Sequence, residues 1–202
     1  MTDPSALNVL AICGSLRAGS FNAGLVRALT ADAPPAMKID VLDAWHELPP
    51  LNNDLVVGGV LPGPVQHISD RIRAADAVII ATPEYCYGVP GTLKNLLDWM
   101  SFPPPVNCFR FKPVGVLGAS AGAFGTVRAQ LALRQTLMFL DATVMTKPEV
   151  YVTDAASKYD SGVLADQPTI KLLRHFLDSF EEFVRVCQAR GLDPATREFL
   201  FT

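Results

Sequence analysis

The 202-residue sequence has few of the residues that build metal sites, disulfide frameworks or nucleic-acid surfaces. Its four cysteines contain no Cys-x-x-Cys pair, and its three histidines form no metal-ligand spacing, so no metal site is expected. The 17 Lys and Arg residues are scattered along the chain, and the net charge is −3. This charge pattern gives no electrostatic reason to expect nucleic acid or an anionic membrane as a partner.

Long apolar runs are also missing. No segment approaches the roughly 18 consecutive apolar residues of a membrane-spanning helix, and no basic region precedes an apolar stretch at the N-terminus. With 50% hydrophobic and 18% charged residues, the composition is that of a folded globular protein. We therefore expect a cytoplasmic protein in which residues 1–202 form one domain.

The sequence does contain a regular alternation of strand-like and helix-like segments. Apolar runs predict strands at residues 7–13, 37–42, 77–82, 113–118 and 143–146. Helical spacing predicts helices at residues 22–33, 64–75, 91–101, 125–140 and 167–190. This alternation is typical of βαβ units, so we predict an α/β fold with a doubly wound, five-stranded parallel sheet.

A polar loop follows the first predicted strand. Gly14-Ser-Leu-Arg-Ala-Gly-Ser-Phe-Asn22 offers hydroxyl, guanidinium and amide groups immediately before a helical pattern begins. Hydroxyls and backbone N–H groups at a helix N-terminus form a cradle for an anion, and a guanidinium adds charged hydrogen bonds. The loop lacks the Lys of a triphosphate-binding loop. We predict that a monophosphate binds here, on Ser15, Arg17, Ser20 and Asn22.

A second loop follows the third predicted strand. Thr82-Pro-Glu-Tyr-Cys-Tyr-Gly-Val-Pro-Gly91 combines a carboxylate, two aromatic rings and several helix-breaking residues. Ligands of doubly wound sheets bind at the carboxyl ends of strands, at the switch point, which here lies between the first and third strands. We expect this loop to hold a planar ring beside the phosphate. The candidate residues are Pro83, Glu84, Tyr85, Cys86, Tyr87 and Gly88.

Four motifs resemble those of the NAD(P)H-dependent FMN reductase family, which includes quinone, azo-compound and chromate reductases. They are Gly14-Ser-Leu-Arg-x-x-Ser-x-Asn22, Thr82-Pro-Glu-Tyr-x-Tyr-Gly-x-Pro-Gly91, Leu93-Lys-Asn-x-x-Asp-Trp99 and Gly118-x-Ser-x-Gly122. The resemblance implies a flavodoxin-like fold with strand order 2-1-3-4-5 and helices on both faces of the sheet. It also implies FMN as the cofactor and NADPH or NADH as the co-substrate.

The resemblance also assigns roles to the two loops. The first loop would hold the FMN phosphate, backbone amides of the second would meet the flavin ring, and Ser120 and Gly122 would lie nearby. The flavin would take hydride from NAD(P)H and reduce a small acceptor by a ping-pong mechanism, without a side chain acting as acid or base. Suitable acceptors are a quinone, an azo compound, free flavin or a metal oxyanion. Cys86 departs from the family, which commonly has Asn there, so we expect one weaker hydrogen bond to the flavin.

Two other functions fit parts of the sequence. Gly118-Ala-Ser-Ala-Gly122 matches the nucleophile elbow of a serine hydrolase, in which Ser120 would act with His175 and an aspartate. The aspartate candidates are Asp141, Asp154 and Asp166. A flavodoxin-like electron carrier without NAD(P)H activity is the second alternative.

A homodimer or homotetramer is also expected. Trp99 and Met100 are predicted to lie exposed beside the aromatic segment 102–111, which would leave an unusually large apolar surface on a monomer. In the family this region meets a partner subunit, so the resemblance favours the same assembly.

Overall fold

The structure is a computed structural model that describes residues 6–101 and 107–191. In this part of the chain, six strands form one parallel sheet with the order β2-β1-β3-β4, and both β5 and β6 pair with β4. The strands are β1 (Leu7–Cys13), β2 (Met37–Val41), β3 (Ala77–Ala81), β4 (Pro113–Ala119), β5 (Thr143–Val144) and β6 (Val150–Val152). The predicted order 2-1-3-4-5 is thus confirmed.

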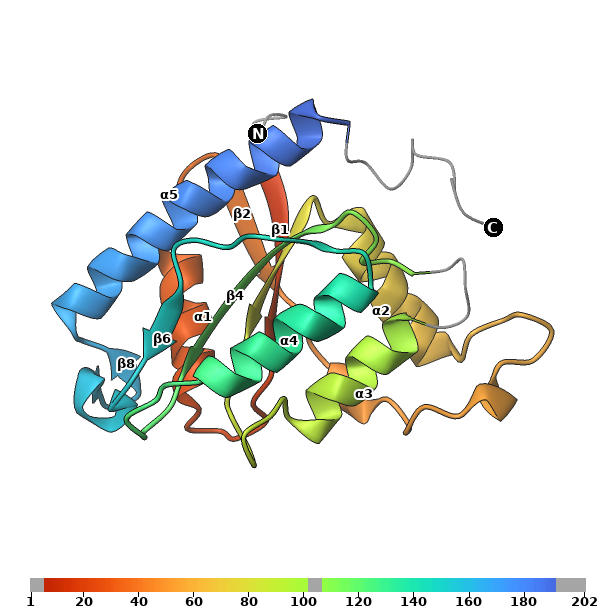
Figure 1. Cartoon of the computed structure of the whole chain (residues 1–202), viewed down its shortest axis with the longest axis horizontal. Helices are drawn as coiled ribbons and strands as arrows, with labels where there is room; N and C mark the ends of the chain where they lie inside the picture. Colours follow the sequence, from red (N-terminus) through yellow and green to blue (C-terminus); the bar gives the residue numbers. More distant parts are fainter. Residues whose placement is uncertain (1–5, 102–106, 192–202) are drawn as a thin grey trace.

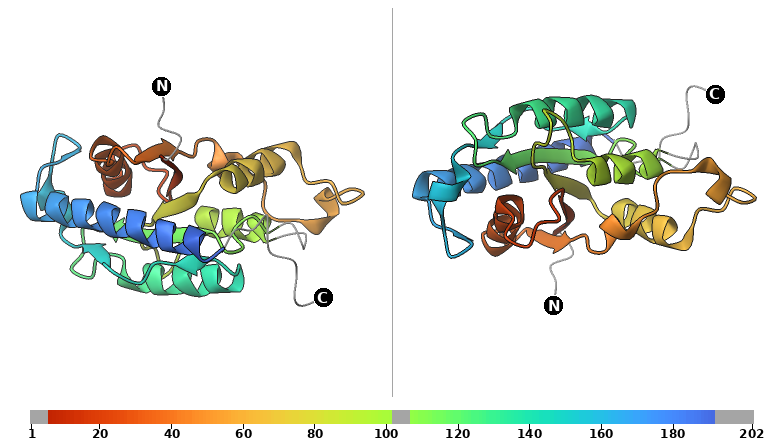
Figure 2. Two further views of the ribbon diagram at one scale, coloured as in Figure 1. Left: turned by 90° about the horizontal axis from the view of Figure 1, so that it is seen from above. Right: turned by 90° about the horizontal axis from the view of Figure 1, so that it is seen from below.

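Five α-helices cover the two faces of the sheet (Figures 1 and 2). They are α1 (Phe21–Ala31), α2 (Gly63–Ala74), α3 (Gly91–Met100), α4 (Val127–Phe139) and α5 (Gln167–Ala189). Helices α1 and α5 pack on one face, and α2, α3 and α4 pack on the other, so each face has its own apolar core. No helix in the described part has both the length and the apolar composition to cross a bilayer.

The fifth strand position differs from the single strand expected at residues 143–146. Strand β5 lies beside the beginning of β4 and β6 beside its end, with Lys147-Pro148-Glu149 between them. Proline has no N–H to donate to a β-ladder, so the strand is interrupted there. The chain then forms a small antiparallel hairpin of β7 (Tyr159–Asp160) and β8 (Val163–Leu164), which the sequence did not predict.

Three short 3₁₀ helices lie in the connections of the described chain. They are η1 (Trp45–Glu47), η2 (Asn53–Leu55) and η3 (Ala155–Lys158).

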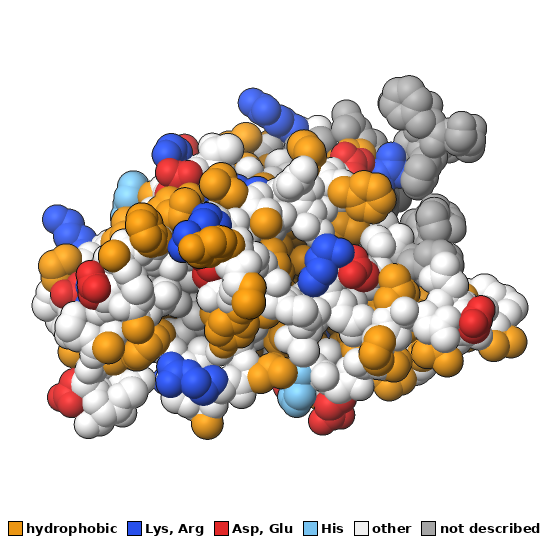
Figure 3. Space-filling view, turned by 60° about the horizontal axis from the view of Figure 1, so that its bottom comes forward, with side chains coloured by type: hydrophobic (Ala, Val, Ile, Leu, Met, Phe, Trp, Pro, Cys, Tyr) orange, Lys and Arg blue, Asp and Glu red, His pale blue; other side chains and the backbone are white. Residues whose placement is uncertain are grey.

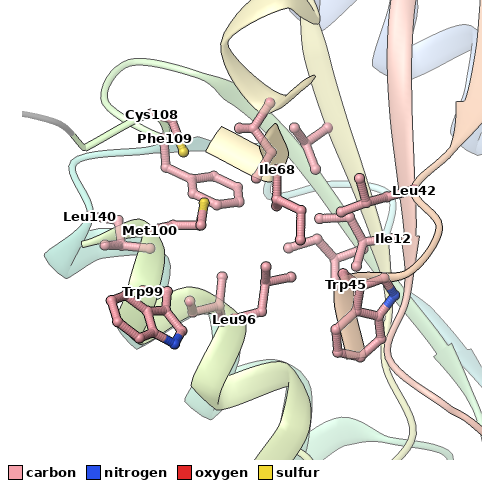
Figure 4. Close-up of a cluster of buried hydrophobic side chains, with 14 of the residues drawn as sticks. Ile12, Leu42, Trp45, Ile68, Leu96, Trp99, Met100, Cys108, Phe109 and Leu140 are labelled. Atoms are coloured by element: carbon pink, nitrogen blue, oxygen red, sulfur yellow. The ribbon is translucent and has the colours of Figure 1, made fainter. Parts of the chain in front are cut away.

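The core between the sheet and α2, α3 and α4 corrects one expectation. Trp99 and Met100 are 0% and 2% exposed, and Figure 4 shows both among the buried side chains of this core, with Phe109 nearby. The prediction that Trp99 and Met100 lie exposed is therefore wrong, because the apolar face of α3 folds back onto its own chain. Residues 102–106 of the aromatic segment lie outside the described residues.

The carboxyl ends of β1, β3 and β4 lie at one edge of the sheet. Cys13 is in register with Ala81, and Ala81 with Leu117, so the loops that follow these strands begin at similar levels. These loops are residues 14–20, 82–90 and 120–126, at the lower edge in Figure 1. The two predicted binding loops are thus neighbours.

Candidate functional site at the carboxyl edge of the sheet

The loop after β1, residues 14–20, presents unpaired hydrogen-bond donors. Between Ser15 and Asn22, only the backbone N–H of Ser20 donates to a described acceptor, the carbonyl of Arg17 at 3.0 Å. Ser20 caps α1, because its Oγ accepts the N–H of Ala23 at 3.2 Å. The other N–H groups have no described acceptor and lie near the positive end of the α1 dipole, so they could donate to an anion; phosphate binding here stays a prediction.

Arg17 adds a positive charge to this loop. Its side chain is exposed, and its guanidinium carbon lies 5.1 Å from the ring centroid of Phe21. No described carboxylate forms an ion pair with it. The cation is therefore available for an anionic ligand.

The side chain of Asn22, predicted to contact the phosphate, instead makes hydrogen bonds within the protein. Its Nδ2 donates to the carbonyl of Ala119 at 3.0 Å, and its Oδ1 accepts the N–H of Ala119 at 2.9 Å. The side chain therefore joins the beginning of α1 to the end of β4. A phosphate contact by Asn22 remains a prediction, and its backbone N–H, which has no described acceptor, is available for such a contact.

The loop after β3 contains a tight turn at residues 85–88. The N–H of Tyr85 donates to the carbonyl of Gly88 at 3.2 Å, and the N–H of Gly88 donates to the carbonyl of Tyr85 at 2.9 Å. Both central residues are left-handed, with φ of 49° at Cys86 and 63° at Tyr87. This is the pattern of a type I′ turn, in which Asn and Gly are preferred. The N–H groups of Glu84, Cys86 and Tyr87 have no acceptor among the described residues.

The turn gives a conformational reason for the departure at Cys86. Asn tolerates the left-handed region better than Cys, so an Asn here would relieve backbone strain whether or not its amide reaches a ligand. We expect Cys86→Asn to raise the free energy of unfolding by about 0.5–1 kcal/mol, measured by denaturant unfolding of the apoprotein. Cys86→Ser, which keeps the size and the strain, is the control. Equal stability of the Asn and Ser variants would contradict the strain explanation.

Glu84 connects the loop after β3 to α4. One carboxylate oxygen accepts the backbone N–H groups of Arg128 and Ala129 at 3.0 and 3.2 Å, and the other accepts Arg128 Nε at 2.6 Å. Thr126, the residue before α4, makes no capping hydrogen bond with its side chain. Glu84 therefore caps α4 from another loop, and its carboxylate is turned toward the helix.

Arg128 joins the same contact region and was not predicted as a site residue. Its guanidinium carbon lies 4.0 Å from the ring centroid of Tyr87 and 5.0 Å from that of Phe124. These distances are typical of cation–π contacts. Arg128 thus fixes two exposed aromatic side chains, from the second and third loops, beside each other.

Near its end, strand β4 is approached very closely at Gly118 by Thr82 of the second loop and by Thr126 of the third. A Cβ at this position would lie far inside van der Waals contact with the Thr126 hydroxyl and the Thr82 carbonyl oxygen. Gly118 is thus required for the ends of β3 and β4 to lie this close together.

Ser120 is hydrogen-bonded within its own loop. Its Oγ accepts the N–H of Gly122 at 3.1 Å. His175 lies on the exposed side of α5 and makes no hydrogen bond to Ser120 in the described chain. Of the candidate acids, Asp141 pairs with Arg110 and Asp166 caps α5. The described contacts therefore assemble no hydrolase triad.

The motif Leu93-Lys-Asn-x-x-Asp-Trp99 anchors another segment. Asn95 Nδ2 and Trp99 Nε1 both donate to the carbonyl of Pro49, at 2.9 and 2.7 Å, and Asn95 Oδ1 accepts the N–H of Leu51 at 2.8 Å. The motif therefore fixes the middle of the long connection between β2 and α2, residues 42–62. The residue pattern indicated no partner for these side chains, because the contacts span more than 40 residues.

Two of the cysteines are buried enough to disfavour the thiolate. Burial raises the pKa of Cys13, and it raises the pKa of Cys108 to about 11. Cys86 is exposed, and no disulfide joins the four cysteines. The described residues contain no group of His, Cys, Asp and Glu that could hold a metal ion.

The site as a whole carries several exposed aromatic side chains. Figure 3 shows the edge where the loops lie, with exposed hydrophobic side chains gathered around Lys and Arg side chains. Tyr85, Tyr87 and Phe124 are 53%, 73% and 67% exposed. N–H groups without described acceptors and exposed aromatic rings thus lie on neighbouring strand ends, where the sequence predicted a phosphate and a planar ring.

Comparison with known proteins gives this surface a family. Residues 7–157 match the family described as NADPH-dependent FMN reductase. The chain is 43% identical over 180 residues to an NAD(P)H-dependent FMN reductase of Pseudomonas aeruginosa, covering 89% of this chain and 96% of that protein. It is 40% identical over 181 residues to a quinone reductase of Escherichia coli, with the same coverage.

The solved structures agree with the sequence relatives. The flavoenzyme FerB of Paracoccus denitrificans, an NAD(P)H:(acceptor) oxidoreductase, superposes with a TM-score of 0.82 at 34% identity, covering 90% of this chain and 98% of FerB. An azoreductase of Bacillus anthracis shares the fold at 18% identity, with a TM-score of 0.55 over 91% of this chain and 99% of that one. The chain therefore belongs to the NADPH-dependent FMN reductase family.

Proposed function

We propose that this protein binds FMN and uses it to transfer electrons from NAD(P)H to a small acceptor such as a quinone. The observation that carries the proposal is the set of N–H groups between Ser15 and Asn22 that, except for that of Ser20, have no described acceptor, beside an Arg17 without an ion-pair partner among the described residues. A phosphate esterified to the ribityl chain would satisfy these donors. The family and its relatives, which are FMN and quinone reductases, support the same cofactor.

The second loop fits the ring of the same cofactor. The unpaired N–H groups of Cys86 and Tyr87 would donate to the polar edge of the flavin, and exposed aromatic side chains would flank it. Donors aimed at a flavin stabilise the electron-rich reduced form. When bound, FMN supplies the hydride and electron chemistry, and we assign no side chain a proton-transfer role.

The remaining predicted residues support the two loops. Pro83 lacks an N–H and is buried, and a Cβ on Gly14 would lie 3.3 Å from its Cδ, so the first and second loops pack together. Ser120 and Gly122 order the third loop through the hydrogen bond between them. We propose that residues 1–202 form a single FMN-binding domain, with these loops at its binding site.

Arg17 provides the test of phosphate recognition. We expect Arg17→Ala to weaken FMN binding by about tenfold to a hundredfold, because hydrogen bonds to a charged group contribute about 1.5–3 kcal/mol. Riboflavin lacks the phosphate, so its affinity should change little. Quenching of flavin fluorescence on titration with apoprotein measures both. Equal weakening of FMN and riboflavin would place the phosphate elsewhere.

We further propose that the protein assembles as a homodimer or homotetramer. Because Trp99 and Met100 are buried, they cannot form the exposed apolar surface expected at the subunit interface. Helix α4 does carry exposed apolar residues that could form it. Leu131, Met138 and Phe139 are 57%, 72% and 80% exposed. Light scattering at several protein concentrations should give at least twice the monomer mass of 21.8 kDa. A monomer at all concentrations would contradict this part of the proposal.

A further inference from the structure

A second hollow lies beside the phosphate loop. Residues 17–20 form one wall of a pocket of about 640 Å³, and the opposite wall comes from α1 and the β7–β8 hairpin. Its volume is within the range of small-molecule sites, about 300–1,000 Å³. The FMN proposal uses the backbone of the loop and the Arg17 guanidinium, and it leaves the part of this pocket toward Arg27 and the hairpin without an assigned ligand.

The walls of this pocket are built by specific contacts. Tyr159 packs on Phe21 with ring centroids 5.2 Å apart, and its hydroxyl donates to the Phe21 carbonyl at 2.7 Å. Gly24 allows the Tyr159 ring to lie against α1, because a Cβ there would overlap that ring. Arg27 Nη2 donates to the carbonyl of Gly162, in the hairpin, at 2.9 Å. The hairpin is thus held against α1, and the hollow between them has defined walls.

The pocket is positively charged. Both Arg17 and Arg27 line it, and neither forms an ion pair with a described carboxylate. Arg174 lines an adjoining pocket and differs, since its Nε lies 3.0 Å from the Asp32 carboxylate. A guanidinium has five N–H donors, and Arg27 uses one atom for Gly162, so donors remain for an anion.

We propose that this pocket binds the 2′-phosphorylated adenosine end of NADPH and that Arg27 gives the enzyme a preference for NADPH over NADH. The proposal rests on the proposed function, because the nicotinamide end must reach the flavin at the second loop. The rest of the dinucleotide must then lie along the surface around the site. NADPH and NADH differ only in the 2′-phosphate, and an unpaired guanidinium in a walled pocket discriminates that charge.

Steady-state kinetics with both co-substrates test the role of Arg27. The informative variant is Arg27→Gln, which keeps an N–H donor for the Gly162 carbonyl and removes the charge. We expect the ratio of kcat/KM for NADPH to kcat/KM for NADH to fall by about tenfold to a hundredfold, through KM. Arg27→Lys should restore part of the ratio. Arg174→Gln is the matched control and should leave the ratio as in the wild type, because Arg174 is paired outside this pocket.

Binding measurements with fragments of NADPH test the pocket without any hydride transfer. Adenosine 2′,5′-bisphosphate should bind the FMN-loaded enzyme in calorimetry, compete with NADPH, and bind at least about tenfold more weakly to Arg27→Gln. Adenosine 5′-monophosphate, which lacks the 2′-phosphate, should bind the wild type and Arg27→Gln with equal affinity. This affinity should be lower than that of the wild type for the bisphosphate.

Two outcomes would overturn the inference. One is an unchanged NADPH/NADH ratio in Arg27→Gln in an enzyme that retains FMN and oxidises NADPH, which would make Arg27 an ordinary solvated arginine. The other is equal affinity of the wild type and Arg27→Gln for the bisphosphate. Failure of the proposed function is distinguishable from both, because the wild-type protein itself would then bind no FMN or oxidise neither co-substrate.

Discussion

Replacing Gly118 by Ala is expected to lower the free energy of unfolding by about 3 kcal/mol and to abolish stable FMN binding. The added methyl group would overlap the Thr126 hydroxyl and the carbonyl oxygen of Thr82. The carbonyl oxygen belongs to the backbone at the end of β3, so the overlap is relieved only by moving the two strand ends apart. Denaturant unfolding of the apoprotein and fluorescence titration with FMN measure the two effects.

The same motif offers a control for this change. A Cβ on Gly122 would have Ser120 Oγ, at 3.6 Å, as its nearest neighbour, which is an ordinary contact. Gly122→Ala should therefore change the free energy of unfolding by less than about 1 kcal/mol. If Gly118→Ala were as stable as Gly122→Ala, the close approach of the two strand ends would be refuted.

Replacing Glu84 by Ala is expected to have the second-largest effect, a loss of about 2–3 kcal/mol of stability. The side chain of Glu84 is only 7% exposed and accepts three hydrogen bonds from the beginning of α4. Its removal deletes a helix cap and leaves the Arg128 guanidinium without its carboxylate. The thermal midpoint of the apoprotein should fall by about 4–12 °C.

Two further variants identify the cause of that loss. Glu84→Gln keeps an acceptor for the helix N–H groups and should recover part of the stability. Glu149→Ala removes an exposed carboxylate that pairs with Lys147 and should change the midpoint little. A midpoint of Glu84→Ala equal to that of Glu149→Ala would exclude Glu84 as a structural link between the second loop and α4.

The parts of the fold that could be predicted are those encoded by nearby residues. The run Ala77–Ala81 is entirely buried in the sheet, and Ser20 caps a helix that begins at the next residue. Both signals, hydrophobic period and capping chemistry, act within one or two turns of chain. The strand order followed from the alternation of these elements together with the family resemblance.

The parts that could not be predicted depend on contacts between distant residues. Asn22 bonds to Ala119, 97 residues away, and Glu84 bonds to Arg128, 44 residues away. Each side chain lies in the predicted loop but faces the protein, so its residue type indicated a site without revealing its contacts. The prediction that Trp99 is exposed was wrong for a similar reason, because the apolar side chains that cover it come from several separate segments.

The measurement that tests the central claim most directly is anaerobic mixing of the FMN-loaded protein with NADPH, followed by flavin absorbance in a stopped-flow instrument. A reductase of this family should lose the oxidised flavin band rapidly, and addition of a quinone should restore it with release of quinol. If the protein binds FMN but the flavin stays oxidised in the presence of NADPH, the proposed reductase function would be contradicted. Such a result would favour the electron-carrier alternative instead.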